Sequence, residues 1–91
     1  MKTIKRSTQF KKDFKRYRNF PAKVKALLEI VRMLENDIPI PAQYDPHLLV
    51  GKYKGHWECH IDNDYLLIWI DYTTNCIKLE RLGTHSELFR K

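Results

Sequence analysis

The spacing of apolar residues changes once along this chain, and the change limits the folds available to it. Between residues 8 and 35, apolar residues recur every three or four positions, which is the period of an amphipathic helix. From Gly55 onward they alternate with polar residues or form short continuous runs, which is typical of strands. Helical segments followed by strands indicate the α+β class, with helices packed on one face of a small, mainly antiparallel sheet.

Two helices are predicted in the first part, after a short candidate strand at Thr3–Arg6 that would be an edge strand. The first helix begins at a cap, Ser7 or Thr8, and ends near Asn19. The second begins at Pro21 and ends where an Asn-Asp-Ile-Pro sequence interrupts its apolar stripe. Because few residues join them, the two helices should form an antiparallel hairpin.

Three strands are predicted in the second part, at 57–62, 65–72 and 76–82, and a short helical tail follows them. Alternation in the first of these strands places Cys59 under the helices and His60 on the opposite, open face of the sheet. The middle strand is apolar on both faces and should be buried. The predicted order is therefore β-α-α-β-β-β with a short C-terminal helical tail.

The length of 91 residues suits one domain, residues 1–91. No apolar run approaches the roughly 20 residues that cross a bilayer, and the start lacks the apolar stretch of a signal peptide, so a cytoplasmic location without a membrane partner is expected. Cys59 and Cys76 should be thiols in the core. Because no Cys or His spacing is typical of a metal site, we expect no metal and no cofactor. The proline-containing segment 39–54 should be a long loop without regular structure.

Positive charge is concentrated at the start of the chain. Residues 1–32 contain 11 basic and 2 acidic side chains, a net charge of +9, whereas residues 33–91 have a net charge of −3. A basic surface of this kind favours a nucleic acid or an acidic protein as the partner. Its alternative is a solvated helix face without a partner. The candidate contacts to RNA are Lys11, Lys12, Lys15 and Arg16, which we call the basic face.

Residues able to catalyse proton transfer are concentrated in the second half. His60 is predicted on the open face, Asp64 follows it across a turn, Arg81 ends the last strand and His85 begins the tail. Histidine accepts or donates a proton near neutral pH, and arginine stabilises negative charge on phosphate. Together they suit RNA cleavage by attack of a 2′-hydroxyl on its own phosphate, which needs a base, an acid and a cation but no metal.

Arg81 also has a structural interpretation. It shares the strand parity of Ile77 and Leu79, which are expected in the core. Either it lies past the covered part of the sheet, or the strand twists at this point. A salt bridge to Glu80 or Asp64 is an equally good explanation.

Two aromatic residues, Phe89 and Tyr65, each have two interpretations. Phe89 is a hydrophobic anchor for the tail or a platform for stacking a base, and Tyr65 is a packing residue or an RNA contact. The acidic residues Asp37, Asp45 and Glu58 are expected to be solvated.

Several motifs then occur together: Glu-Cys-His-Ile at 58–61, Asp-Tyr-Leu-Leu-Ile at 64–68 and Arg-Leu-Gly-Thr-His-Ser-Glu-Leu-Phe at 81–89. This combination resembles the RelE/ParE toxin superfamily, specifically its YafQ-like branch, over essentially the whole chain. The resemblance implies a RelE-like fold and a toxin of a type II toxin–antitoxin pair. Such a toxin is an mRNA endonuclease that acts in the ribosomal A site, with contacts to 16S rRNA, and inhibits translation. Its expected partner is a cognate acidic antitoxin, with which it forms a hetero-oligomer, whereas the free toxin is a monomer.

Carried over by position, the resemblance implies a site made of His47, His60, Asp64, Tyr65, Arg81, His85 and Phe89. His85 would be the acid for the leaving oxygen, and Asp64 or His60 would be the base. Arg81 would stabilise the phosphorane, while Tyr65 and Phe89 would bind substrate. His47 would contact phosphate, although Pro46 replaces an acid that commonly precedes this histidine and could redirect it.

Two other functions remain open from the sequence. A non-catalytic inhibitor of DNA gyrase of the ParE type would share the fold without needing the histidines. An RNA-binding or ribosome-binding module would need only the basic first part of the chain.

Overall fold

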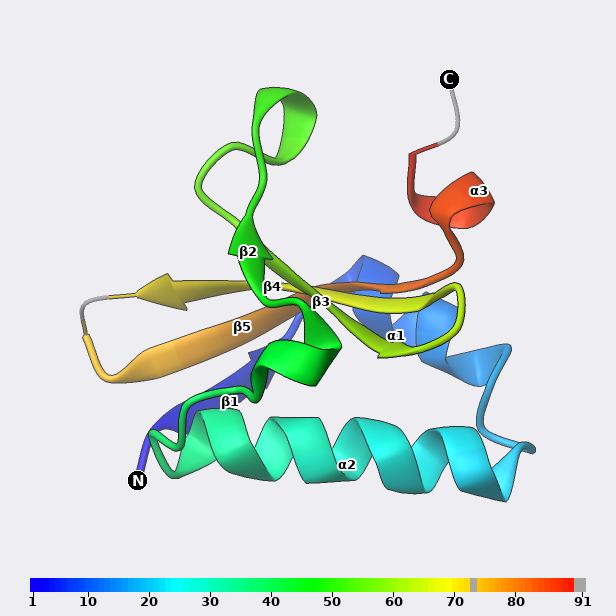
Figure 1. Ribbon diagram of the computed structural model, residues 1–91, viewed down its shortest axis with the longest axis horizontal. Helices are drawn as coiled ribbons and strands as arrows, with labels where there is room; N and C mark the ends of the chain where they lie inside the picture. The colour runs from blue at the N-terminus through cyan, green and yellow to red at the C-terminus, as the bar shows by residue number, and fades with distance from the viewer. Residues whose placement is uncertain (73, 90–91) are drawn as a thin grey trace.

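The computed structural model describes residues 1–72 and 74–89 as a five-stranded sheet with helices on both sides (Figure 1). The strands lie in the order β1-β5-β4-β3-β2; β1 and β5 are parallel and the other neighbours are antiparallel. Along the chain the elements are β1 (Thr3–Arg6), α1 (Thr8–Lys15), α2 (Pro21–Glu35), η1 (Ala42–Tyr44), β2 (His47–Leu48), η2 (Gly51–Tyr53), β3 (Trp57–Asp62), β4 (Tyr65–Tyr72), β5 (Cys76–Gly83) and α3 (His85–Leu88). The predicted α+β class and order of the main elements are confirmed.

The helix starts follow the predicted capping chemistry. The Ser7 hydroxyl accepts a hydrogen bond from the Phe10 N–H at 2.9 Å and caps α1, and Pro21 begins α2. However, α1 ends at Lys15 rather than near Asn19, and the residues after it form turns. No helix in the described part of the chain is long and apolar enough to span a membrane.

Both long helices cover one face of the sheet, as predicted. α1 packs mainly on β5 and α2 on β3, and a groove of about 330 Å³ separates them. The core under them includes Phe10, Leu27, Ile30, Cys59 and Leu67. Both cysteines are buried free thiols, also as predicted.

The opposite face of the sheet is covered only in part. Leu66 and Ile68 of β4 pack against Tyr53 of η2 and Leu88 of α3, so the central strand is buried on both faces. In Figure 1, α3 and the segment after β2 lie on the side of the sheet away from α2. The expectation that 39–54 lacks regular structure was wrong: η1, β2 and η2 lie within it, and β2 adds a fifth strand. Antiparallel pairing of β2 with β3 supplies the backbone hydrogen bonds that the loop alone would lack.

An irregularity in β5 changes the direction of its last residues. Ile68 pairs with Arg81, whereas the next residue of β4, Trp69, pairs with Leu79, so Glu80 is an extra residue in β5. Arg81 therefore leaves the parity of Leu79 and pairs with a residue of the open face. This bulge resolves the parity question that the sequence leaves open.

Candidate active site

Three histidines form a row on the open face, which we call the imidazole row: His47, His60 and His85. The ring centroids of His47 and His60 are 6.2 Å apart, and those of His60 and His85 are 5.6 Å apart. The pairing of β2 with β3 brings His47 opposite Glu58, two residues from His60 on the same face. Pro46 does not remove His47 from the row, and the His47 Nδ1 lies 2.7 Å from the Asp45 carbonyl oxygen.

Asp64 holds His85 at one end of the row. Its Oδ1 accepts hydrogen bonds from the His85 backbone N–H at 2.9 Å and from the His85 ring Nδ1 at 2.8 Å. These two bonds, the backbone one first, hold the pKa of Asp64 below its ordinary value. Because an ionised carboxylate only accepts hydrogen bonds, Nδ1 of His85 carries a proton and Nε2 is the atom left to exchange one with a substrate.

The helix that carries His85 is fixed by Glu87. Glu87 and Thr84 form a capping box, in which the Glu87 carboxylate accepts the Thr84 N–H at 2.9 Å and the Thr84 hydroxyl accepts the Glu87 N–H at 3.2 Å. The same carboxylate accepts a short hydrogen bond from the hydroxyl of Tyr17, which lies in the turn after α1. A Cβ at Gly83 would lie 2.5 Å from Glu87 Oε1 and would displace this carboxylate from the cap, and the Gly83 φ of 154° is a value that other residues rarely adopt. α3 is thus attached to the helical layer, although it has only four residues.

Glu58 lies beneath the imidazole row, and the expectation that it is solvated was wrong. Its side chain is 4% exposed, and its Oε1 lies 3.2 Å from Nε2 of His47 and 3.8 Å from Nε2 of His60. Within the described residues, its Oε2 has no hydrogen-bond partner. Strand alternation could have found this residue, since it shares the face of His60 two positions away.

Arg81 is held by two groups that the sequence did not connect to it. Its Nε donates to Asp13 Oδ2 at 2.8 Å, and its Nη1 donates to the Tyr53 hydroxyl at 3.0 Å. The alternative interpretation, a salt bridge to Glu80 or Asp64, does not hold, because the bulge turns the guanidinium toward α1 and η2 and its ion-pair partner is Asp13. Its side chain is 16% exposed.

Aromatic rings connect Arg81 to the imidazole row. Phe89 is 43% exposed, and its ring lies edge-on to Tyr53 at 5.8 Å and 6.1 Å from His85. A chain of contacts therefore runs from the imidazole row through Phe89 and the buried Tyr53 to the Arg81 guanidinium. His56 lies outside the row, where it contacts Glu80 at 3.3 Å.

Tyr65 does not belong to this chain of contacts, and its prediction as a substrate contact was wrong. Tyr65 is 1% exposed and packs in the core. The centroid of its ring lies 4.9 Å from that of the Tyr17 ring and 4.6 Å from the Lys23 ammonium nitrogen. As the first residue of β4, Tyr65 has a parity that directs its side chain to the helix-covered face.

The fold also gathers metal-ligand atoms that are scattered in the sequence. Donor atoms of Glu58, His60 and His85 all lie within 4.8 Å of one another. The expectation of no metal depended on local spacing, and that argument fails because β3 and α3 contribute the donors together.

The basic face is exposed along α1 and just after it. Arg16 lies between two carboxylates, with Nη1 3.4 Å from Asp13 Oδ1 and 3.4 Å from Glu87 Oε2. Among the described residues, no hydrogen bond or ion pair is made by the side chains of the three lysines, although Lys11 and Lys15 line the groove between α1 and α2.

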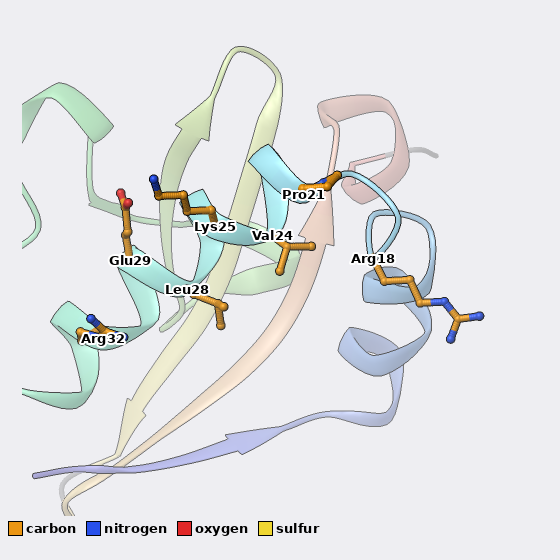
Figure 2. Close-up of a pocket in the computed structure, with 7 residues that line it drawn as sticks. All are labelled: Arg18, Pro21, Val24, Lys25, Leu28, Glu29 and Arg32. Atoms are coloured by element: carbon orange, nitrogen blue, oxygen red, sulfur yellow. The ribbon is translucent and has the colours of Figure 1, made fainter.

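The hollows on the helical side are lined by other residues. One of about 510 Å³ follows α2 and is lined by Arg18, Pro21, Val24, Lys25, Leu28, Glu29 and Arg32 (Figure 2). The groove between α1 and α2 also contains no histidine. His60 of the imidazole row lines a separate, shallow hollow of about 350 Å³ with Gln43, Tyr44 and Asn63.

Comparison with known proteins identifies the family of the chain. The family model of the YafQ bacterial toxins of type II toxin–antitoxin systems matches residues 2–90. The chain belongs to the YafQ family. It is 36% identical over 90 residues to the mRNA interferase toxin YafQ of Escherichia coli K12, with 94% of each chain covered.

Solved structures of bacterial toxins have the same fold. A metal-bound toxin from Helicobacter pylori is 38% identical with a TM-score of 0.88, over 98% of this chain and all of that one. The toxin chain in an E. coli DinJ–YafQ toxin–antitoxin complex is 34% identical with a TM-score of 0.82, over 97% of both chains. The predicted RelE-like fold and family membership are confirmed.

Proposed function

We propose that this toxin is an endoribonuclease of the mRNA interferase type, which cleaves mRNA in the ribosomal A site and thereby inhibits translation. The observation that carries the proposal is the imidazole row, in which one histidine is held by a carboxylate at 2.8 Å. The E. coli relative named as an mRNA interferase supports the same activity.

The reaction needs two proton transfers. The 2′-hydroxyl loses its proton to a base as its oxygen bonds to the adjacent phosphorus, and the bond from phosphorus to the 5′-oxygen breaks. The leaving 5′-oxygen takes a proton from an acid, which leaves a 2′,3′-cyclic phosphate and a 5′-hydroxyl. No metal enters this scheme, since every proton has a side-chain donor or acceptor.

His85 is the acid and His60 the base in this proposal. Asp64 orients the His85 ring by its hydrogen bond to Nδ1, so that Nε2 faces the substrate and gives the proton to the leaving oxygen. Asp64 itself is a weak base, because the two hydrogen bonds that lower its pKa both come from His85. His60 lies next to His85, and its Nε2 is 3.8 Å from Oε1 of the buried Glu58.

Arg81 and Phe89 would act on the phosphate and on a base. A guanidinium has five N–H donors, and the contacts of Arg81 to Asp13 and Tyr53 use three of them. The remaining two would stabilise the phosphorane. The exposed Phe89 ring would stack on a base, a contact worth about 1–3 kcal/mol. His47 would contact phosphate from the far end of the row.

Macromolecular partners follow from the charge distribution. The basic face would contact 16S rRNA, where release of counterions favours binding. The neutralising partner would be an acidic cognate antitoxin, as the DinJ–YafQ complex of the relative suggests.

The test is primer extension on mRNA from cells that express the wild type or His85→Ala. In-frame cuts within codons in the wild type and none in the variant are expected. Growth arrest by a folded His85→Ala variant would refute the catalytic role and favour a gyrase inhibitor or a ribosome-binding module instead.

A further inference from the structure

Asp13 of α1 is fully buried, with 0% of the residue exposed, yet it carries a charge. Burial by itself raises the pKa of this carboxyl. Hydrogen bonds from Arg81, the Leu82 N–H and Gln9 oppose that effect and leave the pKa below its ordinary value. A buried ionised carboxylate is retained only where donors surround it. The arrangement of those donors indicates what Asp13 does.

Four residues donate to this one carboxylate. Oδ2 accepts from Arg81 Nε at 2.8 Å and from the Leu82 N–H at 3.0 Å. Oδ1 accepts from Gln9 Nε2 at 3.1 Å, and from Arg81 Nη2 and Arg16 Nη1 at 3.4 Å each. Arg81 thus faces Asp13 with two nitrogens along one edge of its guanidinium, which defines the plane of the group.

The end of β1 explains why a helix residue reaches this position. β1 pairs with β5 only as far as Arg6 and Leu79, so the following β5 residues lack a strand neighbour on that side. The Ser7 hydroxyl donates to the Glu80 carbonyl at 2.8 Å, and Asp13 accepts the Leu82 N–H. α1 therefore continues the edge of the sheet by side-chain hydrogen bonds, and the β5 bulge places Arg81 between those two contacts.

A second contact fixes the guanidinium from the other side. The Tyr53 hydroxyl accepts from Arg81 Nη1 at 3.0 Å, and the Tyr53 ring lies edge-on to Phe89. With Asp13 along one edge and Tyr53 at one nitrogen, the orientation of the unused N–H donors is determined.

We propose that Asp13 is a positioning residue for the reaction: it acts through Arg81 and aims its free N–H donors at the phosphate of the substrate. This inference rests on the proposed function, since it assumes a catalytic Arg81. Asp13 lies on α1, the helix that carries most of the basic face. The element that would bind rRNA therefore also fixes the orientation of the Arg81 guanidinium. No feature of the local sequence around Asp13 indicates this role, because its partner is 68 residues away.

The test uses Asp13→Asn, which keeps the shape of the side chain and removes its charge, with purified toxin and ribosomes carrying mRNA. We expect kcat to fall on the order of 10- to 100-fold with KM changed less than threefold, as for a misplaced catalytic group. Asp37→Asn is the matched control, because the Asp37 side chain is 75% exposed and its ion-pair partner is Lys2, which belongs neither to the imidazole row nor to the contacts of Arg81; kcat of this variant should stay within twofold of the wild type.

Non-additivity separates positioning from a general structural role. In an Arg81→Ala background, Asp13→Asn should lower kcat by less than twofold, because the group that it orients is gone. Guanidinium ion at tens of millimolar should partly restore Arg81→Ala and should not restore the double variant. An additive loss, or equal rescue of both proteins, would overturn the inference, as would an unchanged kcat in folded Asp13→Asn.

A readout without RNA covers the case in which the substitution unfolds part of the chain or the proposed function fails. The Arg81 Nε–H signal in the nitrogen-15 NMR spectrum should exchange with water at least tenfold faster in Asp13→Asn than in Asp37→Asn, whereas Tyr53→Phe, which removes a contact to Nη1 only, should leave the Nε–H exchange rate close to that of Asp37→Asn. Equal exchange rates in all proteins would overturn the inference. If the wild type cleaves no ribosome-bound mRNA while Arg81 exchange responds as expected, the proposed function fails and the orienting contact stands.

Discussion

Replacing Tyr65 by phenylalanine should stabilise the protein and leave RNA cleavage unchanged. The Tyr65 ring is 1% exposed, and within the described residues its hydroxyl is buried without a hydrogen-bond partner. An unsatisfied buried hydroxyl costs about 1–3 kcal/mol. Phenylalanine removes this cost and keeps the ring contacts with Tyr17 and with the Lys23 ammonium.

The small void left by the oxygen offsets part of the gain, so we expect a net increase of about 1 kcal/mol in the free energy of unfolding. For a domain of this size that corresponds to a rise in Tm of about 4–8 °C. Urea denaturation at pH 7 measures the free energy, and cleavage of ribosome-bound mRNA is assayed in parallel. Destabilisation by more than about 1 kcal/mol would show that the hydroxyl has a partner. Impaired cleavage at unchanged stability would restore Tyr65 as a substrate contact.

The same variant has a distinct dependence on pH. Burial raises the pKa of Tyr65 to about 12, above the ordinary value of 10.0 in the unfolded chain. The stability linked to this group is therefore complete below pH 10 and is lost as the pH rises towards 12, because the unfolded chain ionises first. The advantage of Tyr65→Phe over the wild type should increase above pH 10. A constant difference between pH 9 and pH 11 in urea midpoints would argue against the burial of this hydroxyl.

Three further predictions concern the surface. His85→Ala should lower cleavage by about 10²–10⁴-fold, the usual contribution of a general acid, with an unchanged far-UV spectrum; His56→Ala, outside the row, is the matched control and should stay within threefold. Replacing Lys11, Lys12 and Lys15 of the basic face by glutamine should raise KM for ribosomes and reduce the slope of log affinity against log salt, with kcat retained, and an unchanged slope would exclude these contacts. Cleavage should continue in EDTA. Micromolar Zn²⁺ or Cu²⁺ should inhibit it, because the metal would bind the ring nitrogens of His60 and His85. Glu58→Gln should weaken that inhibition, because Glu58 supplies the third ligand atom. Zn²⁺-stimulated cleavage after EDTA would contradict the metal-free scheme.

The amino-acid sequence by itself determined the order of the elements and the faces of their strands. Capping by Ser7, the start of α2 at Pro21 and the placement of His60 on the open face all follow from neighbours within four residues. Such features depend on the backbone geometry of one helix or strand, so a local pattern predicts them.

The tertiary structure decided the chemistry of Arg81, Glu58 and Tyr65. One extra residue in β5 changed the face of Arg81, and its partner Asp13 comes from a helix 68 positions earlier. Glu58 and His60 join His85 as candidate metal ligands only because β3 and α3 meet. Strand register, bulges and burial depend on which distant segments pack together. The spacing of neighbouring residues does not predict these features, because the free energy that favours one register or bulge comes from contacts across the whole domain.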